Sequence, residues 1–424
     1  MRSLGLQVRQ SFSGITRIAV LFSVIVASAA CAQKPVKTGA QLLYESSFER
    51  LEGLRVGLIV NHTSRVIDAH LIDLAHADPG VTVAALFGPE HGLRGAEEDG
   101  VAIPDGVDKL TGAPVYSLYG RTRKPEPAML DGLDILVFDI QDVGARFYTY
   151  ISTMGLAMQA AAEAGMPFMV LDRPNPLSGS YVSGFVLEPE LTSFVGQFAI
   201  PIAHGLTVGE LARMIKGAAL LPGLENLDLK VVPMSGWTRS MQWPDTNLPW
   251  LPTSPNIPDF TTALAYPGLC LFESTSASEG RGTPTPFLHV GATWADGAEL
   301  ALALNEAGLP GVTFEATTFT PMLIEGMETN PKLSGQTLEG VRIRVTDRMV
   351  YQPVETGIHL LHAFYHAAPD QDAFLSRPRW LDRLSGTSRL NAMLPSALPD
   401  AIIASWSDEL EAFRAARAEY LIYN

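Results

Sequence analysis

The sequence predicts an α/β fold in which a Rossmann-like, mostly parallel sheet forms an N-terminal domain. Four short apolar runs that end abruptly in polar residues lie at 55–60, 83–87, 134–138 and 167–171. Their Val, Ile and Leu residues do not alternate with polar ones, which is typical of strands covered by helices on both faces. A segment rich in Ala and Met, 150–164, predicts a helix between two of these strands. Alternating strands and helices favour a parallel sheet.

Polar side chains follow each of the four predicted strands. In open parallel sheets, ligands bind beyond the carboxyl ends of the strands, so we expect a functional site at this edge. The polar residues that follow the strands in chain order are Asn61, then Glu90, His91 and Arg94, then Asp139, Asp142 and Arg146, and then Asp172, Arg173 and Asn175.

A proline-rich stretch at 243–258 predicts a connector between two domains, because repeated prolines interrupt both helices and central strands. We therefore expect an N-terminal domain at 40–255 and a smaller α/β or α+β domain at 256–424. Within the second domain the pattern predicts a strand at 268–272, a polar loop at 273–286, a helix at 297–307, a strand at 341–346 and terminal helices.

The first 32 residues have the character of a secretory signal. Three arginines precede an apolar run at 18–26, and no acidic residue occurs before Glu45. The run is too short to span a membrane, so we expect an exported protein. Small residues surround Cys31, which leaves two kinds of processing open: a lipid anchor on Cys31 or ordinary cleavage nearby. The mature protein is then periplasmic or anchored in the cell envelope.

Composition excludes some classes of partner. The chain has 424 residues, 47% of them hydrophobic, and can therefore bury more than one core. Its net charge of −15 argues against nucleic acid as a partner. Cys31 and Cys270 are the two cysteines, and Cys31 lies at the processing site, so no intramolecular disulfide is expected. The oligomeric state stays open.

Several well-known catalytic motifs are absent from the sequence. The first predicted strand runs into residues 61–65 (NHTSR) in place of a glycine-rich dinucleotide fingerprint. No P-loop, no G-x-S-x-G serine elbow and no H-E-x-x-H zinc motif occurs. We therefore expect no cofactor. The remaining carboxylates, arginines and amides suit hydrolysis of glycosidic bonds, in which a carboxylic acid protonates the leaving oxygen.

Three histidines, His359, His362 and His366, fall on one face of a predicted helix. Such spacing raises the possibility of a zinc site. Zinc sites usually recruit ligands from more than one element, however, and the intervening residues of this segment are apolar. We interpret the segment as an ordinary packed helix and expect no metal site.

Seven segments spread over the chain form an ordered set of motifs. They are 87–95 (FGPEHGLRG), 113–120 (APVYSLYG), 137–150 (VFDIQDVGARFYTY), 171–176 (LDRPNP), 204–210 (HGLTVGE), 254–258 (SPNIP) and 278–282 (SEGRG). Together they resemble the exo-β-N-acetylmuramidase (NamZ-type) family of bacterial peptidoglycan hydrolases. The resemblance implies a Rossmann-like domain, a smaller C-terminal domain and a cleft between them. It also implies release of N-acetylmuramic acid from the non-reducing ends of muramyl-β-1,4-N-acetylglucosamine chains, in cell-wall turnover and recycling.

Three carboxylates are candidates for catalytic roles, one from the resemblance and two from their position after a predicted strand. The glutamate of the family's proline-glutamate-histidine-glycine motif falls on Glu90, which we predict to be the general acid. The alternative is a carboxylate that caps a strand-to-helix turn. Asp139 and Asp142 are candidates for the base or for the group that stabilises an oxocarbenium-like transition state. Their alternative role is ion pairing with Arg146.

Further residues are candidates for substrate binding. Guanidinium groups pair with carboxylates, which makes the arginines candidates for the lactyl carboxylate of muramic acid. The amide at 256 suits hydrogen bonding to the N-acetyl group or to hydroxyls, and its alternative role is to fix the proline loop. The ring at 148 suits stacking on a sugar, and its alternative role is packing in the core. The candidates are Arg94, Arg146 and Arg281 for the carboxylate, Asn256 and Tyr148 for the sugar, and Asn61, His91 and the loop residue Glu279 around them.

Two other functions stay open for the same residues. One is a peptidoglycan-fragment binding protein that has kept the cleft without turnover. The other is an esterase or amidase that acts on the same wall polymer, which the missing serine elbow disfavours.

Overall fold

The computed structural model describes residues 1, 5, 7, 10, 35–90, 92–93 and 106–424. Residues 35–424 form one compact unit. Cys31, His91 and Arg94 lie outside the described residues, as does almost all of the predicted secretory segment. Within the described part of the chain, no helix has the length and apolar character needed to cross a membrane.

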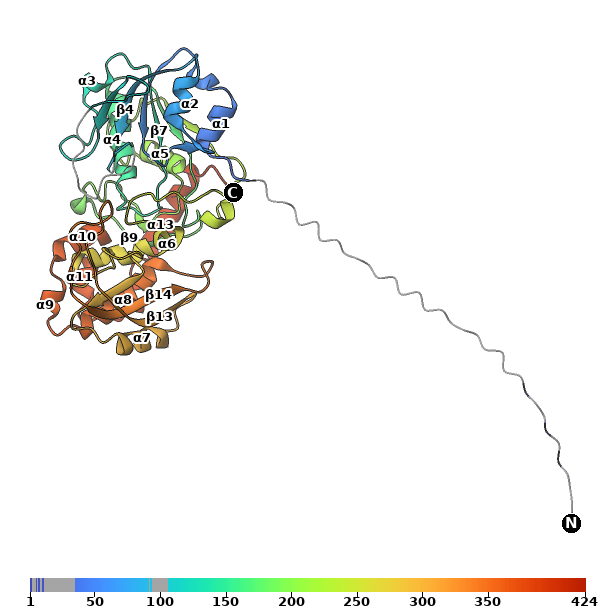
Figure 1. The fold of residues 1–424 in the computed structure, drawn as a ribbon, viewed down its shortest axis with the longest axis vertical. Helices are drawn as coiled ribbons and strands as arrows, with labels where there is room; N and C mark the ends of the chain where they lie inside the picture. The colour runs from blue at the N-terminus through green and yellow to red at the C-terminus, as the bar shows by residue number, and fades with distance from the viewer. Residues whose placement is uncertain (2–4, 6, 8–9, 11–34, 91, 94–105) are drawn as a thin grey trace. The chain divides into compact units, whose positions relative to one another are not determined.

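A seven-stranded sheet forms the N-terminal region, in blue and green in Figure 1. Its strand order is β11-β8-β7-β1-β4-β6-β5, and every neighbouring pair is parallel except β5 with β6. The prediction of a mostly parallel sheet is confirmed, and the four predicted strands correspond to β1, β4, β7 and β8. The bounds are β1 Arg55–Val60, β4 Thr82–Gly88, β5 Gly106–Val107, β6 Pro114–Ser117, β7 Ile135–Asp139, β8 Phe168–Leu171 and β11 Leu229–Val232.

Helices cover both faces of this sheet. α1 (Gly39–Glu45) and α2 (Leu71–Ala77) pack with Leu58 and other inward residues of one face. α4 (Tyr150–Glu163) and α5 (Val208–Gly217) pack on the opposite face, where neighbouring strand residues point. Burial on both faces explains why the strand sequences are apolar throughout, since successive side chains point to opposite sides.

The order of strands brings the residues that follow β1, β4 and β7 to the same edge of the sheet. β1 lies between β4 on one side and β7 on the other, so the chain changes direction across the sheet at β1. Asn61 follows β1, Glu90 follows β4 and Asp139 ends β7. The predicted polar residues therefore meet at the carboxyl edge, at the point where open α/β sheets bind ligands.

The C-terminal region contains a smaller, antiparallel sheet, in orange in Figure 1, which makes this region α+β. The predicted helix at 297–307 and strand at 341–346 match α7 and the end of β14. The predicted strand at 268–272 is wrong, because these residues form the end of α6 and a 3-10 helix, η4. A short apolar run is equally compatible with a buried helix. The bounds are β12 His289–Ala292, β13 Val312–Phe319, β14 Leu338–Val345, α6 Phe260–Leu269, η4 Cys270–Ser274, α7 Gly297–Glu306, α8 Pro353–Ala367 and α10 Pro378–Ser385.

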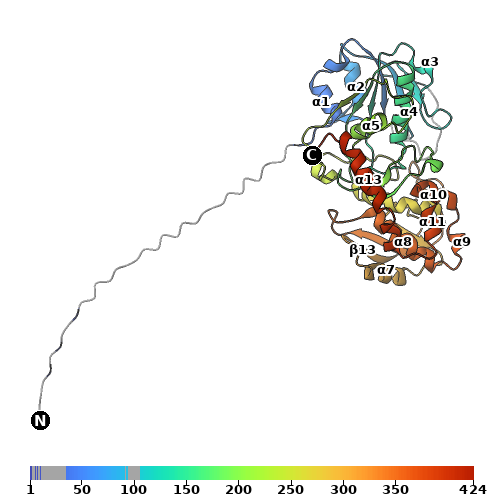
Figure 2. The ribbon, with the colours of Figure 1, turned by 180° about the vertical axis from the view of Figure 1, so that it is seen from behind.

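The end of the chain returns to the N-terminal region (Figure 2). α13 (Ser407–Arg417) packs against β9 (Ser183–Val186), and the hydroxyl of Tyr423 donates a hydrogen bond to Asp172 Oδ2 at 2.6 Å. Contacts made by the end of the chain thus join the two regions, in addition to the connector at 243–258. The remaining elements are β2 Arg65–Val66, β3 Ala69–His70, β10 Pro201–Ala203, α3 Pro127–Leu130, α9 Gln371–Phe374, α11 Arg389–Met393, α12 Pro399–Ala404 and the 3-10 helices Glu49–Leu51, Pro189–Leu191, Trp243–Thr246 and Ala418–Tyr420.

Candidate active site

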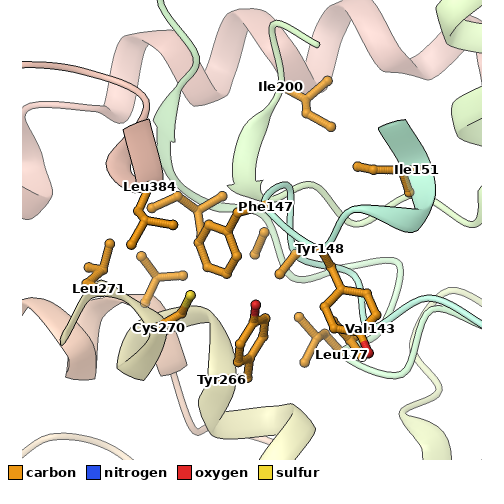
Figure 3. Packing of buried hydrophobic residues seen from close by; sticks show 14 of the residues in the cluster. Val143, Phe147, Tyr148, Ile151, Leu177, Ile200, Tyr266, Cys270, Leu271 and Leu384 are labelled. Atoms are coloured by element: carbon orange, nitrogen blue, oxygen red, sulfur yellow. The ribbon is translucent and has the colours of Figure 1, made fainter. Parts of the chain in front are cut away.

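A cavity of about 610 Å³ lies beyond the carboxyl end of β4, between the two regions. Segments far apart in the sequence supply its walls. Figure 3 shows Phe147, Tyr266, Cys270 and Leu384, four of its lining residues, close to one another. The lining residues are Glu90, Tyr119, Arg123, Phe147, Tyr148, Thr149, Tyr150, Ser193, Phe194, Val195, Ser254, Asn256, Ile257, Tyr266, Cys270, Glu273, Arg281, Phe287, Arg377, Trp380, Arg383 and Leu384.

Glu90 lies in the wall of the cavity, two residues beyond the end of β4. Its side chain is half-buried, and its Oε2 accepts a hydrogen bond from the Thr149 hydroxyl at 2.6 Å. Thr149 is the N-cap residue of α4. A strand end and a helix start therefore fix the Glu90 carboxylate in the wall of the cavity. Its catalytic role stays a prediction.

Asp139 is not among the residues that line the cavity. The carboxylate is fully buried and forms a bidentate ion pair with Arg173, with Nε to Oδ1 at 2.6 Å and Nη2 to Oδ2 at 2.8 Å. The predicted alternative of pairing with Arg146 is also wrong for this residue. Asp139 and Arg173 follow neighbouring strands, so their pair joins the carboxyl ends of β7 and β8. The prediction of Asp139 as a catalytic base or transition-state stabiliser is therefore not supported by its position.

Asp142 is likewise buried and absent from the cavity wall. Its Oδ2 accepts the backbone N–H of Gly144 at 2.6 Å. Burial raises the pKa of this carboxyl to about 7, because the charged form loses its hydration. The prediction of Asp142 as a catalytic base or transition-state stabiliser is therefore not supported by its position.

The raised pKa of Asp142 predicts a specific dependence of stability on pH. Between about pH 4 and pH 7 the folded protein holds a proton that the unfolded chain has released. The stability from this group is complete below about pH 4 and is lost as pH rises through 7. The amide introduced by Asp142→Asn does not titrate, so the free energy of unfolding of this variant does not fall with this group. As pH rises across this window, it should increase relative to that of wild type by on the order of 1 kcal/mol per pH unit.

Urea denaturation of both proteins at pH 5, 6, 7 and 8 measures this difference. Burial also raises the pKa of Asp172 to about 7, but this residue is present in both proteins and cancels in the comparison. A constant difference between the two free energies of unfolding from pH 5 to 7 would refute the assignment.

Arg146 is fully buried and does not reach the cavity, which corrects its prediction as a carboxylate ligand. Its guanidinium donates to the carbonyls of Phe185 at 2.8 Å, Ile200 at 2.9 Å and Leu384 at 2.8 Å. Gly386 lies so close that a Cβ there would be 2.5 Å from Nη2, and its φ of +85° is also one that favours glycine. Arg146 thus anchors the carboxyl end of α10 to the N-terminal region.

Arg281 lines the cavity as predicted, but carboxylates surround its guanidinium. Nη2 lies 2.9 Å from Glu273, Nη1 3.4 Å from Glu328 and Nε 3.6 Å from Glu279. Glu279 is buried, lies outside the cavity wall and also pairs with Lys332 Nζ at 2.6 Å. The positive charge of Arg281 is therefore compensated within the protein, and Glu279 holds the loop rather than facing a ligand.

Two of the remaining predicted residues line the cavity. Tyr148 donates its hydroxyl to Thr253 Oγ1 at 2.9 Å and packs edge-on against Tyr266. Asn256 donates Nδ2 to the carbonyl of Met327 at 3.0 Å, while its Oδ1 is buried without a hydrogen-bond partner among the described residues. An unpaired buried acceptor is costly. Asn256 Oδ1 is therefore suited to accept an N–H or hydroxyl from a ligand.

Asn61 is fully buried and not part of the cavity wall. Its Oδ1 accepts from the backbone N–H of Thr63 at 2.9 Å and from the Thr63 hydroxyl at 2.6 Å. It shapes the turn after β1, as asparagine commonly does, and its prediction as a substrate ligand is corrected.

The sequence did not single out several residues of the cavity. Glu273, its second carboxylate, lies on η4, a segment where a loop was predicted. Trp380 and Arg383 share one face of α10, and their three-residue spacing is visible in the sequence. The sequence does not show what that face covers. The additional wall residues that bear charged or aromatic side chains are Tyr119, Arg123, Phe194, Glu273, Arg377, Trp380 and Arg383.

The three histidines of α8 lie outside the cavity. The rings of His362 and His366 have centroids 4.2 Å apart, while His359 Nε2 lies 3.5 Å from Asp400 Oδ1. In the part of the chain that the structure describes, no group of three or more His, Cys, Asp or Glu side chains is placed to hold a metal ion.

Comparisons with known proteins identify relatives over the whole compact unit. Residues 56–261 match the family model for the N-terminal part of the exo-β-N-acetylmuramidase NamZ, and residues 264–423 match the model for its C-terminal part. A Bacillus subtilis (strain 168) protein named peptidoglycan β-N-acetylmuramidase NamZ is 42% identical over 423 residues, which cover 97% of this chain and 99% of that protein.

Two crystal structures of DUF1343 family proteins from Bacteroides fragilis NCTC 9343 have the same fold. The TM-scores are 0.84 and 0.77, at 38% and 34% sequence identity. Each comparison covers 92% of this chain and 99% of the other. One assignment follows from the architecture, from the two matching family models and from the sequence identity to the Bacillus subtilis protein over nearly the whole chain. The chain belongs to the NamZ family of exo-β-N-acetylmuramidases.

Proposed function

We propose that this protein hydrolyses the β-1,4 bond that links a terminal, non-reducing N-acetylmuramic acid to N-acetylglucosamine. The reaction releases N-acetylmuramic acid from peptidoglycan fragments. Family membership and the name of the Bacillus subtilis relative support the reaction and the substrate. In this chain, the main observation that supports the proposal is the position of Glu90 in the wall of the cavity.

The proposed chemistry rests on a few side chains of the cavity. Glu90 protonates the glycosidic oxygen as the bond breaks, which is the role of the carboxylic acid in glycoside hydrolysis. N-acetylglucosamine leaves as an alcohol, and one water molecule supplies the hydroxyl at the anomeric carbon and the proton that restores Glu90. Its hydrogen bond with Thr149 holds the carboxyl in place. Asn256 Oδ1 accepts a hydrogen bond from the acetamido N–H, and Tyr148 packs against a sugar ring.

The place of action is a separate part of the proposal. The arginines and the apolar run that precede residue 32 support export, with either a lipid anchor on Cys31 or cleavage nearby. An exported enzyme with this activity would act in turnover and recycling of the cell wall.

The test is the identity and order of the products. Purified mature protein should release N-acetylmuramic acid stepwise from the disaccharide and from peptide-free glycan strands that end in this sugar, as followed by chromatography with mass detection. N-acetylglucosamine as the first product, or internal cleavage alone, would refute the proposal. Binding without turnover would favour a peptidoglycan-fragment binding protein, and release of acyl groups or peptides would favour an esterase or amidase.

A further inference from the structure

One face of α10 forms a wall of the cavity. Trp380 and Arg383 line it three residues apart on one side of the helix, and Arg377, the N-cap residue, lines it just before the helix begins. Both ends of the helix are anchored. The backbone N–H of Arg377 donates to the Ser274 carbonyl at 2.9 Å, and the buried guanidinium of Arg146 donates to the Leu384 carbonyl at 2.8 Å. The face is therefore held in a fixed position before any ligand arrives.

The charged residues of the cavity leave an excess of positive charge. Glu273 and Arg281 form an ion pair at 2.9 Å and neutralise each other. Among the other charged residues of the described wall, Arg123, Arg377 and Arg383 oppose the carboxylate of Glu90. Counted over these described residues, the excess is two positive charges when Glu90 is ionised. This excess occurs on a chain whose net charge is −15, so the cavity is suited to an anion.

The three arginines differ in what their guanidinium groups contact. Arg123 lies over the ring of Phe194 at 4.4 Å, and Arg377 lies over the ring of Trp380 at 5.0 Å. Arg383 forms neither an ion pair nor a ring contact with any described residue, and its side chain is exposed. Its guanidinium keeps all its donors for a ligand, and a planar fork of this kind binds a carboxylate through two parallel hydrogen bonds.

We propose that Arg383 binds the carboxylate of the lactyl group of the terminal muramic acid, beside Trp380, and so selects muramic acid over N-acetylglucosamine. This inference rests on the proposed function, which supplies the sugar. N-acetylglucosamine has a hydroxyl where muramic acid has the lactyl ether, and it therefore brings no charge to Arg383. Arg377 adds positive charge to the same wall, whereas Arg146 acts only by holding the helix.

The test compares wild type with Arg383→Gln and Arg383→Lys on 4-nitrophenyl β-N-acetylmuramide. Arg383→Gln should raise KM by about tenfold to a hundredfold, with kcat changed little, because a hydrogen bond to a charged group is lost in both ground and transition states. Arg383→Lys should recover part of the loss, since it restores the charge without the fork. Arg379→Gln is the matched control, because Arg379 is exposed on the same helix and does not line the cavity.

Calorimetric binding of the free sugars separates this proposal from the proposed function. Wild type should bind N-acetylmuramic acid more tightly than its neutral lactyl N-methylamide, and Arg383→Gln should lose most of this preference, because only the weaker attraction of the other arginines remains. The same muramic acid affinity in wild type and Arg383→Gln would overturn the proposal even if the enzyme hydrolyses muramides. Arg383-dependent binding by a protein that has no glycosidase activity would sustain the carboxylate subsite and reject the proposed function.

Discussion

Replacement of Glu90 by Gln should lower the turnover of the natural disaccharide by about a hundredfold to ten-thousandfold, the usual cost of losing general acid catalysis. The amide keeps the shape of the side chain and can still accept the hydrogen bond from Thr149, so the fold should persist. The transferable proton is what the variant loses. The loss should therefore be smaller for a nitrophenyl muramide, whose leaving group needs no proton.

Initial rates on both substrates measure this effect, and circular dichroism checks the fold. Glu273→Gln provides a second carboxylate variant in the same cavity, and it removes the ion pair with Arg281. Any loss it causes should be similar for the two substrates, because Glu273 is not the proton donor. Near wild-type turnover of the disaccharide by Glu90→Gln would show that Glu90 is a structural group and that another residue is the acid.

Asp139→Asn should lower the free energy of unfolding by about 3–5 kcal/mol, the usual cost of removing one partner from a buried ion pair. The variant leaves the Arg173 guanidinium beside a neutral amide, in a site where both side chains are almost inaccessible to water. Water cannot reach the Arg173 guanidinium to solvate its charge in place of the lost carboxylate. Turnover per folded molecule should fall far less than in Glu90→Gln, because Asp139 does not line the cavity.

Urea denaturation measures the change, and Asp228→Asn is its control. Asp228 pairs with Lys230 at 3.5 Å on the surface, where such pairs contribute about 0–1 kcal/mol. The contrast between the two variants isolates the effect of burial. A large loss of turnover by Asp139→Asn with unchanged stability would instead return Asp139 to the list of catalytic candidates.

Local sequence patterns predicted the parallel sheet and the position of its functional edge. The apolar runs of β1, β4, β7 and β8 are long enough to be strands, and they end in polar residues because the chain leaves the core there. The same pattern singles out Glu90, which follows the apolar run of β4. The pattern could not separate Glu90 from Asp139, because a carboxylate after a buried strand can face a cavity or a buried arginine equally well.

The sequence by itself determined the fold class, the sheet edge and the family, since each of these depends on residues close together in the chain or on ordered motifs. The tertiary structure alone decided which charges face the cavity. Arg146, Arg281 and Arg383 have the same side chain, yet the first binds backbone carbonyls, the second is surrounded by carboxylates and the third is exposed in the cavity wall. Their partners lie on segments from other parts of the chain, and a guanidinium is neutralised or left for a ligand according to what packing brings within about 4 Å of it.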